Sequence, residues 1–142
     1  MLQISWEIFE SLCIKLNKKI KYDLDYVLCI NSGGLLAGKL LAEYKKKPLV
    51  VISARSYDGV KRKDLKVGSI SSLERISGKV LIVDDLVDSG YTMKAVVELV
   101  KTFQEVKDIK TATLIYKPVS IFKPDFYVKE TSKWVKFPYE SE

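Results

Sequence analysis

Short runs of Val, Ile and Leu alternate along this chain with stretches whose apolar residues recur at helical spacing, and this alternation constrains the fold. The runs predict strands at Tyr26–Ile30, Pro48–Ser53, Lys79–Val83, Lys110–Tyr116 and, more briefly, Asp125–Val128. The helical stretches are Ser5–Ile20, Leu35–Tyr44 and Thr92–Phe103. Such alternation predicts an α/β fold with a mostly parallel central sheet flanked by helices. At 142 residues the chain has the size of one domain, so we expect a single domain over 1–142.

The composition restricts the chemistry that this domain can perform. The chain has no histidine, which excludes a Ser-His-Asp triad and a histidine general base. The formal net charge of +6 suits a nucleic acid, a membrane surface or a phosphorylated small molecule, although a lysine-rich solvated surface explains it equally well. No run of Lys and Arg exceeds three residues, and aromatic residues do not alternate with basic ones. Nucleic acid is therefore an unfavoured partner.

The sequence also bears on where the protein works. No apolar run approaches the roughly 18 residues needed to cross a bilayer. The amphipathic N-terminal segment carries Glu7 and Glu10 and has neither a basic start nor a small-residue cleavage site, so it is not a signal peptide. Cys13 and Cys29 lie in apolar patterns without metal-ligand spacing, which predicts reduced core residues. We expect a cytoplasmic protein with no membrane partner.

Ligands of open parallel sheets bind beyond the carboxyl ends of the strands, which directs attention to the loops after Ile30, Ser53 and Val83. The third loop carries Asp84, Asp85 and Asp88 within five residues. Two adjacent carboxylates directly after a buried strand are electrostatically costly unless a positive group arrives. They suit a diol or a hydrated Mg²⁺, and the backbone and hydroxyl groups from Ser89 to Thr92 suit a phosphate at a helix start. The plain alternative is a polar turn capped by Asp88 or Ser89.

The segment from Val80 to Thr92, VLIVDDLVDSGYT, resembles the phosphoribosyl pyrophosphate (PRPP) motif of type I phosphoribosyltransferases. The motif consists of four apolar residues, two acids, two apolar residues and then Asp-Ser/Thr-Gly with a following Thr. The resemblance extends from about Tyr26 to Glu140 and is greatest to the short 6-oxopurine enzymes of the xanthine-guanine type and their archaeal relatives. It implies the single-domain fold of that family with a small C-terminal hood segment.

The resemblance assigns roles within this motif. Asp84 and Asp85 would contact the ribose hydroxyls, and Asp88 would lie near N7 of the purine as the catalytic general base or acid. The 5′-phosphate would be held by Asp88, Ser89, Gly90, Tyr91 and Thr92. Tyr91 departs from the family, which usually has a small residue there, so its side chain must point away from the phosphate or the loop must differ in shape.

The loop after the first strand would bind pyrophosphate in this family, often with a non-proline cis peptide; it comprises Asn31, Ser32, Gly33 and Gly34. Paired glycines let the backbone approach an anion closely, although a tight strand-to-helix turn explains them as well. Many relatives carry Arg or Lys at the position of Ser32. The candidates to replace that charge are Arg55 and the cluster Lys61–Lys63.

The loop after the second strand, about 54–68, is basic and contains glycine, which predicts a mobile loop. It resembles the flexible catalytic loop of the family, which begins with a Ser-Tyr pair and closes over pyrophosphate. Arg55, Ser56 and Tyr57 would then join the pyrophosphate site. An ordinary exposed basic loop is the alternative.

The tail, about 117–142, would supply the base pocket. The resemblance implies that Lys117 donates to O6 of the base, that Trp134 stacks on the purine, and that the backbone near Val135 meets the 2-position. Glu140 would read a 2-amino group. An ammonium is a donor only, so Lys117 favours a 6-oxo over a 6-amino base. The alternative for Trp134 is a core or interface aromatic residue.

Taken together, the sequence predicts an Mg²⁺-dependent purine phosphoribosyltransferase of the 6-oxopurine class, acting in purine salvage on PRPP and hypoxanthine, guanine or xanthine. Mg²⁺ would sit between substrate oxygens and waters, assisted indirectly by Asp84 and Asp85. Members of the family generally pair, so we expect a homodimer or homotetramer. Two alternatives stay open: a non-catalytic sensor of nucleotides or PRPP on the same fold, and a phosphoribosyltransferase for another base.

Overall fold

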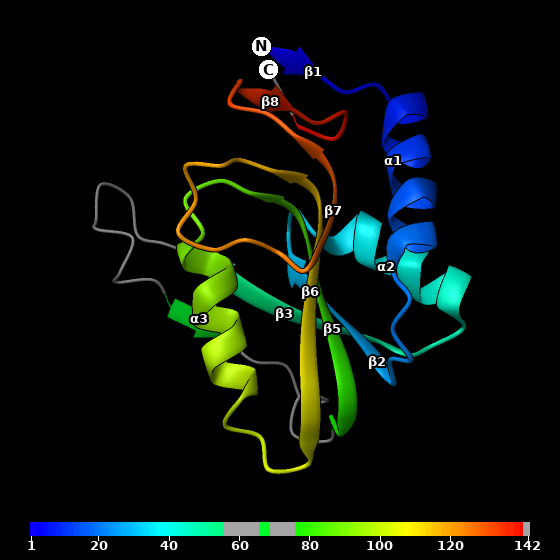
Figure 1. Ribbon diagram of the computed structural model, residues 1–142, viewed down its shortest axis with the longest axis vertical. Helices are drawn as coiled ribbons and strands as arrows, with labels where there is room; N and C mark the ends of the chain where they lie inside the picture. Colours follow the sequence, from blue (N-terminus) through cyan, green and yellow to red (C-terminus); the bar gives the residue numbers. More distant parts are fainter. Residues whose placement is uncertain (56–65, 69–75, 141–142) are drawn as a thin grey trace.

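The computed structural model describes residues 1–55, 66–68 and 76–140, and its elements are drawn in Figure 1. In chain order they are β1 (Leu2–Gln3), α1 (Trp6–Lys19), β2 (Tyr26–Asn31), α2 (Leu35–Lys45), β3 (Leu49–Arg55), β4 (Lys66–Gly68), β5 (Gly78–Val87), α3 (Tyr91–Val100), β6 (Val106–Tyr116), β7 (Phe126–Glu130) and β8 (Val135–Lys136). No helix in this part of the chain is long and apolar enough to cross a membrane.

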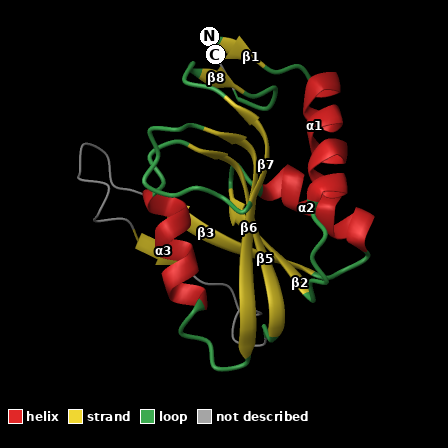
Figure 2. Ribbon diagram, in the orientation of Figure 1, coloured by secondary structure: helices red, strands yellow, loops and turns green. Residues whose placement is uncertain are grey.

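Six strands form the central sheet in the order β4-β3-β2-β5-β6-β7. All neighbours pair in parallel except β4, which runs antiparallel to β3. Figures 1 and 2 show α1 and α2 on one side of this sheet and α3 on the other. The predicted α/β class and the mostly parallel sheet flanked by helices are confirmed.

The central strands contribute residues to two separate cores, one on each face of the sheet. In β5, Leu81 and Val83 belong to the core shared with α1 and α2, whereas Val80 and Ile82 belong to the core shared with α3. Both faces are therefore apolar, which explains why the strands read as continuous Val/Ile/Leu runs.

Both cysteines lie in this interior, as the apolar patterns around them predict. Cys13 and Cys29 are fully buried and free. Burial raises the pKa of Cys13 to about 12 and that of Cys29 to about 11, so both thiols stay protonated at neutral pH.

The structure corrects the predicted elements at their edges. β6 begins at Val106, four positions before the predicted start at Lys110, and β5 continues to Val87 instead of ending at Val83. The predicted loop 54–68 is wrong at both ends, because β3 continues to Arg55 and Lys66–Gly68 forms β4. An edge strand offers unpaired backbone groups, and β4 satisfies those of β3. Residues 56–65 of that loop lie outside the described residues.

A second, two-stranded sheet was not predicted. Here β1 pairs in parallel with β8, with the Leu2 N–H donating to the Trp134 carbonyl at 2.7 Å and the Ile4 N–H to the Lys136 carbonyl at 2.9 Å. In Figure 1 this small sheet lies above the end of the central sheet where β5 and β6 finish. The N-terminal residues thus hold the C-terminal tail over the carboxyl ends of the parallel strands.

The substitution Ile4→Ala tests whether this attachment stabilises the fold. Ile4 is 2% exposed in the core shared with α1, so its truncation is expected to lower the free energy of unfolding by about 2–5 kcal/mol. The matched control is Ile8→Ala, since Ile8 is 47% exposed and should change stability by less than about 0.5 kcal/mol. Urea denaturation followed by circular dichroism measures both. Equal losses in the two variants would contradict the packing described here.

Candidate active site

The predicted anion loops after β2 and β5 lie together because these strands are neighbours, with Cys29 opposite Val83. Gly34, at the start of α2, packs directly on the end of β5. A Cβ atom built on it would come within 2.6 Å of the Val83 carbonyl oxygen and 2.9 Å of Asp84 Cα. Only glycine fits this contact, so the pair Gly33-Gly34 allows the two loops to meet.

A small cavity of about 90 Å³ opens where β5 passes into α3, and we call it the β5–α3 cavity. It is lined by Asp84, Leu86, Val87, Asp88, Ser89, Gly90, Thr92 and Met93. Among the described residues no side chain caps α3, so the predicted alternative of a cap by Asp88 or Ser89 is not formed. The first N–H groups of a helix need acceptors and favour an anion. The cavity therefore has the chemistry of a phosphate site.

The turn into this cavity depends on Gly90 and tolerates Tyr91. Gly90 has a φ of 94°, and a Cβ there would lie 2.4 Å from Ser120 Oγ, so a side chain is excluded on both counts. Tyr91, the first residue of α3, is 38% exposed and does not line the cavity. Its bulk thus leaves the cavity open.

The two adjacent acids of the motif face different surroundings, because successive residues of a strand point to opposite faces. Asp84 lines the β5–α3 cavity. Asp85 instead lies against the loop after β2, where a Cβ on Gly33 would come within 2.8 Å of both Asp85 carboxylate oxygens. The Asp85 N–H donates to Asp84 Oδ1 at 2.8 Å, which restrains the Asp84 side chain.

Both carboxyl groups hold their protons more tightly than usual. Burial raises the pKa of Asp84 well above its ordinary value of 3.8, and the charge of Asp85 raises it further. Burial also raises the pKa of Asp85, against a hydrogen bond from Tyr139 that favours the ionised form. A cation or hydrogen-bond donor arriving at Asp84 would relieve this cost, as a ligand with a diol or a metal would do.

The predicted base-site residues Asp88, Lys117 and Trp134 converge beside the β5–α3 cavity. Lys117 follows β6, and its backbone N–H donates to the Val87 carbonyl at 3.0 Å. Lys117 Nζ lies 3.7 Å from Asp88 Oδ1 and 5.6 Å from the centroid of the Trp134 ring. The Lys117 side chain is buried, that of Asp88 is half-exposed, and Trp134 is 68% exposed. Trp134 is thus no core residue, and it presents an aromatic surface next to a cation and a carboxylate.

The other two residues predicted for the base pocket are Val135 and Glu140. Val135 is buried in β8. The carbonyls of its neighbours Trp134 and Lys136 accept hydrogen bonds from the N–H groups of Leu2 and Ile4. Alternate carbonyls of a strand point to opposite edges, so that of Val135 is turned away from β1. Glu140 is exposed, and its charge contributes to the raised pKa of Asp85, which locates it near Asp85.

The predicted pyrophosphate loop is only partly described. The Asn31–Ser32 peptide bond is cis, as the resemblance implies, and Ser32 is exposed. The backbone of Arg55 ends β3 at the same edge of the sheet, since Asn31 pairs with Ser53. Ser56, Tyr57 and Lys61–Lys63 lie outside the described residues.

Tyr139 was not predicted as a site residue, yet its hydroxyl lies between two acceptors and shares its one proton between the Gly33 carbonyl, at 3.1 Å, and the Asp85 carboxylate. Burial and the charge of Asp85 raise the pKa of this hydroxyl, so it remains a donor. The only sequence signal for Tyr139 was its place in the aromatic segment Trp134–Tyr139 of the tail. A contact among residues this far apart in sequence leaves no local pattern.

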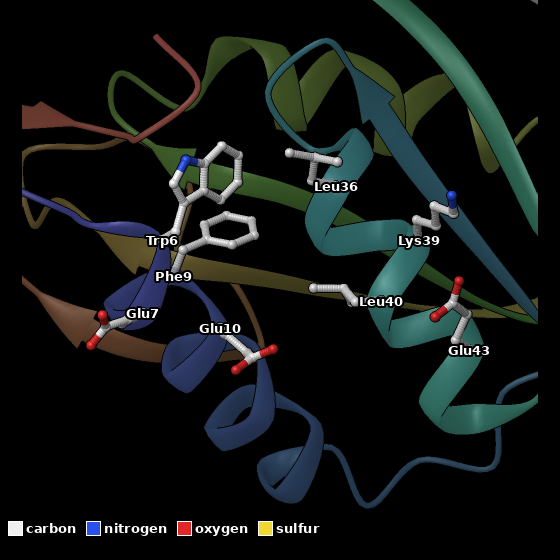
Figure 3. A pocket seen from close by; sticks show the side chains of 8 residues that line it. All are labelled: Trp6, Glu7, Phe9, Glu10, Leu36, Lys39, Leu40 and Glu43. Carbon is white, nitrogen blue, oxygen red and sulfur yellow. The ribbon is translucent and has the colours of Figure 1, made fainter.

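A larger cavity of about 470 Å³ lies between α1 and α2, away from the motif residues. Figure 3 shows Trp6 and Phe9 of α1 pointing toward Leu36 of α2. The floor is apolar, and the rim carries Glu7, Glu10, Lys39 and Glu43. Size alone therefore does not identify the active site, because the motif residues surround the smaller cavity.

The raised pKa of Asp84 predicts a pH-dependent stability without ligand. Since the pKa is higher in the folded than in the unfolded chain, the folded protein holds more protons between the two values. The free energy of unfolding should therefore fall as pH rises above about 4, and Asp84→Asn should flatten this dependence. Urea titrations between pH 4.5 and 8, in the absence of PRPP and Mg²⁺, measure it at roughly half-unit steps.

The control is Glu98→Gln, which removes an exposed carboxylate from α3 and should leave the slope unchanged. Parallel curves for the wild type and Asp84→Asn would contradict the raised pKa.

The chain is similar to known proteins over most of its length. The model of the phosphoribosyl transferase domain family matches residues 3–141. The chain is similar to the xanthine-guanine phosphoribosyltransferase of Chromohalobacter salexigens, with 28% identity over 144 aligned positions that cover 96% of this chain and 82% of that protein.

Two solved structures are similar over nearly the whole chain. The purine phosphoribosyltransferase of Pyrococcus horikoshii has a TM-score of 0.83 and 32% identity, covering 99% of this chain and 94% of that one. The xanthine-guanine-hypoxanthine phosphoribosyltransferase of Helicobacter pylori has a TM-score of 0.85 and 25% identity, covering 96% and 91%. Because the family model spans both anion loops and the tail, the chain belongs to the phosphoribosyltransferase family, whose enzymes are glycosyltransferases of the pentosyl class.

Proposed function

We propose that the protein transfers the phosphoribosyl group of PRPP to a 6-oxopurine base, namely hypoxanthine, guanine or xanthine, in purine salvage. The products would be the nucleoside monophosphate and pyrophosphate. The observation that carries the proposal is the convergence of Asp88, Lys117 and Trp134 beside the β5–α3 cavity. The three relatives named above are each named as purine phosphoribosyltransferases, which supports the same choice.

The base would stack on Trp134 with its 6-oxo oxygen toward Lys117. An ammonium donates hydrogen bonds and accepts none, so it matches a carbonyl and opposes a 6-amino group. The exposed face of Trp134 leaves room for a planar ring. The outward carbonyl of Val135 is the candidate acceptor near the 2-position, and Glu140, by its position near Asp85, is the weaker one.

The ribose phosphate would bind at the end of β5. The β5–α3 cavity offers helix N–H groups and the Ser89 and Thr92 side chains to the 5′-phosphate. Asp84 lines this cavity and would accept from a ribose hydroxyl, which relieves part of its electrostatic cost. Asn31, Ser32, Gly33 and Gly34 would contact pyrophosphate, and Arg55, Ser56 and Tyr57 are the further residues proposed for the pyrophosphate site.

In the proposed reaction, N9 of the base bonds to C1 of the ribose while the bond from C1 to pyrophosphate breaks. Asp88 takes the proton from N7, and Lys117 stabilises the charge that develops on O6. General base catalysis of this kind contributes about 10²- to 10⁴-fold. Asp88 Oδ1 lies 3.7 Å from Lys117 Nζ, so the proposed proton acceptor and the proposed donor to O6 are adjacent.

The residues present fit a magnesium ion that is held mainly by the substrate. In residues 1–55, 66–68 and 76–140, no three acidic, histidine or cysteine side chains gather into a metal cage. Asp84 and, less directly, Asp85 would hold such an ion through water. When bound, Mg²⁺ would neutralise charge on the pyrophosphate group.

The first test is a panel of bases with PRPP and Mg²⁺, in which pyrophosphate release is measured. We expect release with one or more of hypoxanthine, guanine and xanthine and none with adenine. Release with a non-purine base alone would favour an enzyme for another base. No release with any base, together with tight binding of nucleotides, would favour a sensor on the same fold.

The second test separates base binding from PRPP binding. Lys117→Met is expected to lower kcat/KM for the base about 10- to 100-fold, the scale of a lost hydrogen bond to a charged group, while KM for PRPP stays the same. Asp88→Asn should lower kcat by about 10²- to 10⁴-fold. The matched control is Lys133→Met, which removes an exposed cation one residue before Trp134. If Lys133→Met and Lys117→Met behave alike, the base assignment is wrong.

We further propose that the protein works in the cytoplasm as a homodimer or homotetramer. The free thiols of Cys13 and Cys29 agree with a reducing compartment. Exposed apolar side chains at the groove between α1 and α2, including Trp6 and Leu36, support assembly.

Light scattering on the purified protein tests the assembly. Leu36→Glu is expected to reduce the measured mass to that of a smaller assembly, because the charge would be buried at a contact between copies. Val119→Glu, at a position that is 81% exposed, should leave the mass unchanged. A monomeric wild type would contradict the proposal.

A further inference from the structure

We propose that Tyr139 is a positioning residue for the PRPP half of the reaction: its hydroxyl holds the loop after β2 in register with the acids at the end of β5. The identity of the ligand, PRPP, rests on the proposed function. The contacts among Gly33, Asp85 and Tyr139, which we call the junction, are independent of that proposal.

The peptide between Gly33 and Gly34 is held at both ends. Its N–H, from Gly34, donates to the Ile30 carbonyl at 2.7 Å, and its carbonyl, from Gly33, accepts from the Tyr139 hydroxyl at 3.1 Å. Two such bonds fix the plane of a peptide that lies in the loop proposed to bind pyrophosphate. Loss of the Tyr139 hydroxyl would leave one end of this peptide unfixed.

The same hydroxyl shares its proton with the Asp85 carboxylate, which lies against Gly33. Asp85 does not line the β5–α3 cavity, so its place in the motif is not explained by a contact there. Its carboxylate instead meets the loop, at a distance that leaves no space for a Cβ on Gly33. Asp85 and Tyr139 thus form one support under the loop, while Asp84 remains directed to the ribose side.

Aromatic packing makes Tyr139 a rigid arm for this contact. Its ring stacks on Phe137 with centroids 5.5 Å apart and meets the edge of Phe9 at 5.6 Å. The centroid of the Trp6 ring lies 6.2 Å from that of Tyr139. Figure 3 shows Trp6 and Phe9 together at the start of α1. The hydroxyl is therefore delivered from a fixed ring, and removing it need not disturb the packing.

Tyr139 also acts on a different part of the site from the base residues. Lys117 and Trp134 contact each other beside the β5–α3 cavity, whereas Tyr139 contacts the core shared with α1 and α2. A positioning role for Tyr139 therefore predicts a defect in PRPP binding without a defect in base binding. A general loosening of the tail would affect both.

The experiment compares Tyr139→Phe with Tyr44→Phe, which removes a hydroxyl from a tyrosine that is 37% exposed on α2. Calorimetry measures the Kd for Mg²⁺ with PRPP, and steady-state kinetics measures KM for each substrate. Tyr139→Phe is expected to raise the Kd and KM for PRPP about tenfold, as for one lost hydrogen bond to a charged group, and to leave KM for the base unchanged. Tyr44→Phe should match the wild type.

A second variant approaches the same junction from the other side. Gly33→Ala would push a methyl group against Asp85. It is expected to raise the Kd and KM for PRPP as Tyr139→Phe does, and to leave KM for the base unchanged. The proposal is overturned if Tyr139→Phe leaves PRPP binding unchanged, or if it weakens base and PRPP binding equally. A wild type that binds PRPP but releases no pyrophosphate with any purine refutes the base reaction alone, because the calorimetric comparison still decides the role of Tyr139. A wild type that does not bind PRPP overturns both.

Discussion

Near its carboxyl end, β5 places the carboxyl groups of Asp84 and Asp85 next to each other in a partly buried position, and the rest of the site is arranged around that electrostatic cost. Strand geometry separates them, so Asp84 turns to the β5–α3 cavity and Asp85 turns to the loop after β2. One acid is supported inside the protein by Tyr139. The other, Asp84, faces the β5–α3 cavity and is left to be satisfied by what binds. A single strand thus serves two different purposes at consecutive positions.

This division continues outward from β5. On the side of α3 lie the helix N-terminus, Asp88, Lys117 and Trp134, which together suit a phosphate and a planar base. On the side of α1 and α2 lie Gly33, Asp85 and the aromatic residues around Tyr139. The proposed phosphate and base contacts therefore lie on the side of α3, whereas Gly33, proposed to contact pyrophosphate, lies with Asp85 and Tyr139 on the other side.

Much of this arrangement was predictable from the sequence, because it is written in local patterns. Continuous apolar runs specify β2, β3, β5 and β6, and the motif from Val80 to Thr92 locates the strand-to-helix turn. Lys117 and Trp134 were recognisable by resemblance, and the structure brings them within contact distance. In each of these cases, neighbours in sequence or a known motif carry the information.

The remaining features depend on contacts between distant segments. Two-residue strands such as β1 and β8 have no periodicity to detect, and the orientation of Asp85 becomes clear only when Gly33 and Tyr139 lie beside it. Likewise, β4 could not be distinguished from the basic loop that contains it. A pattern of residue types along the chain says which groups are available, and tertiary packing decides which of them meet.

The pairing of β1 with β8 has a consequence for the order in which the site assembles. Leu2 and Val135 must pair before the position of Trp134 is fixed. Bringing these two residues together closes a loop that contains nearly the whole chain, which costs much conformational entropy until the central sheet has formed. The central sheet and the loops after β2 and β5 can thus form first, and the position of Trp134 is fixed last.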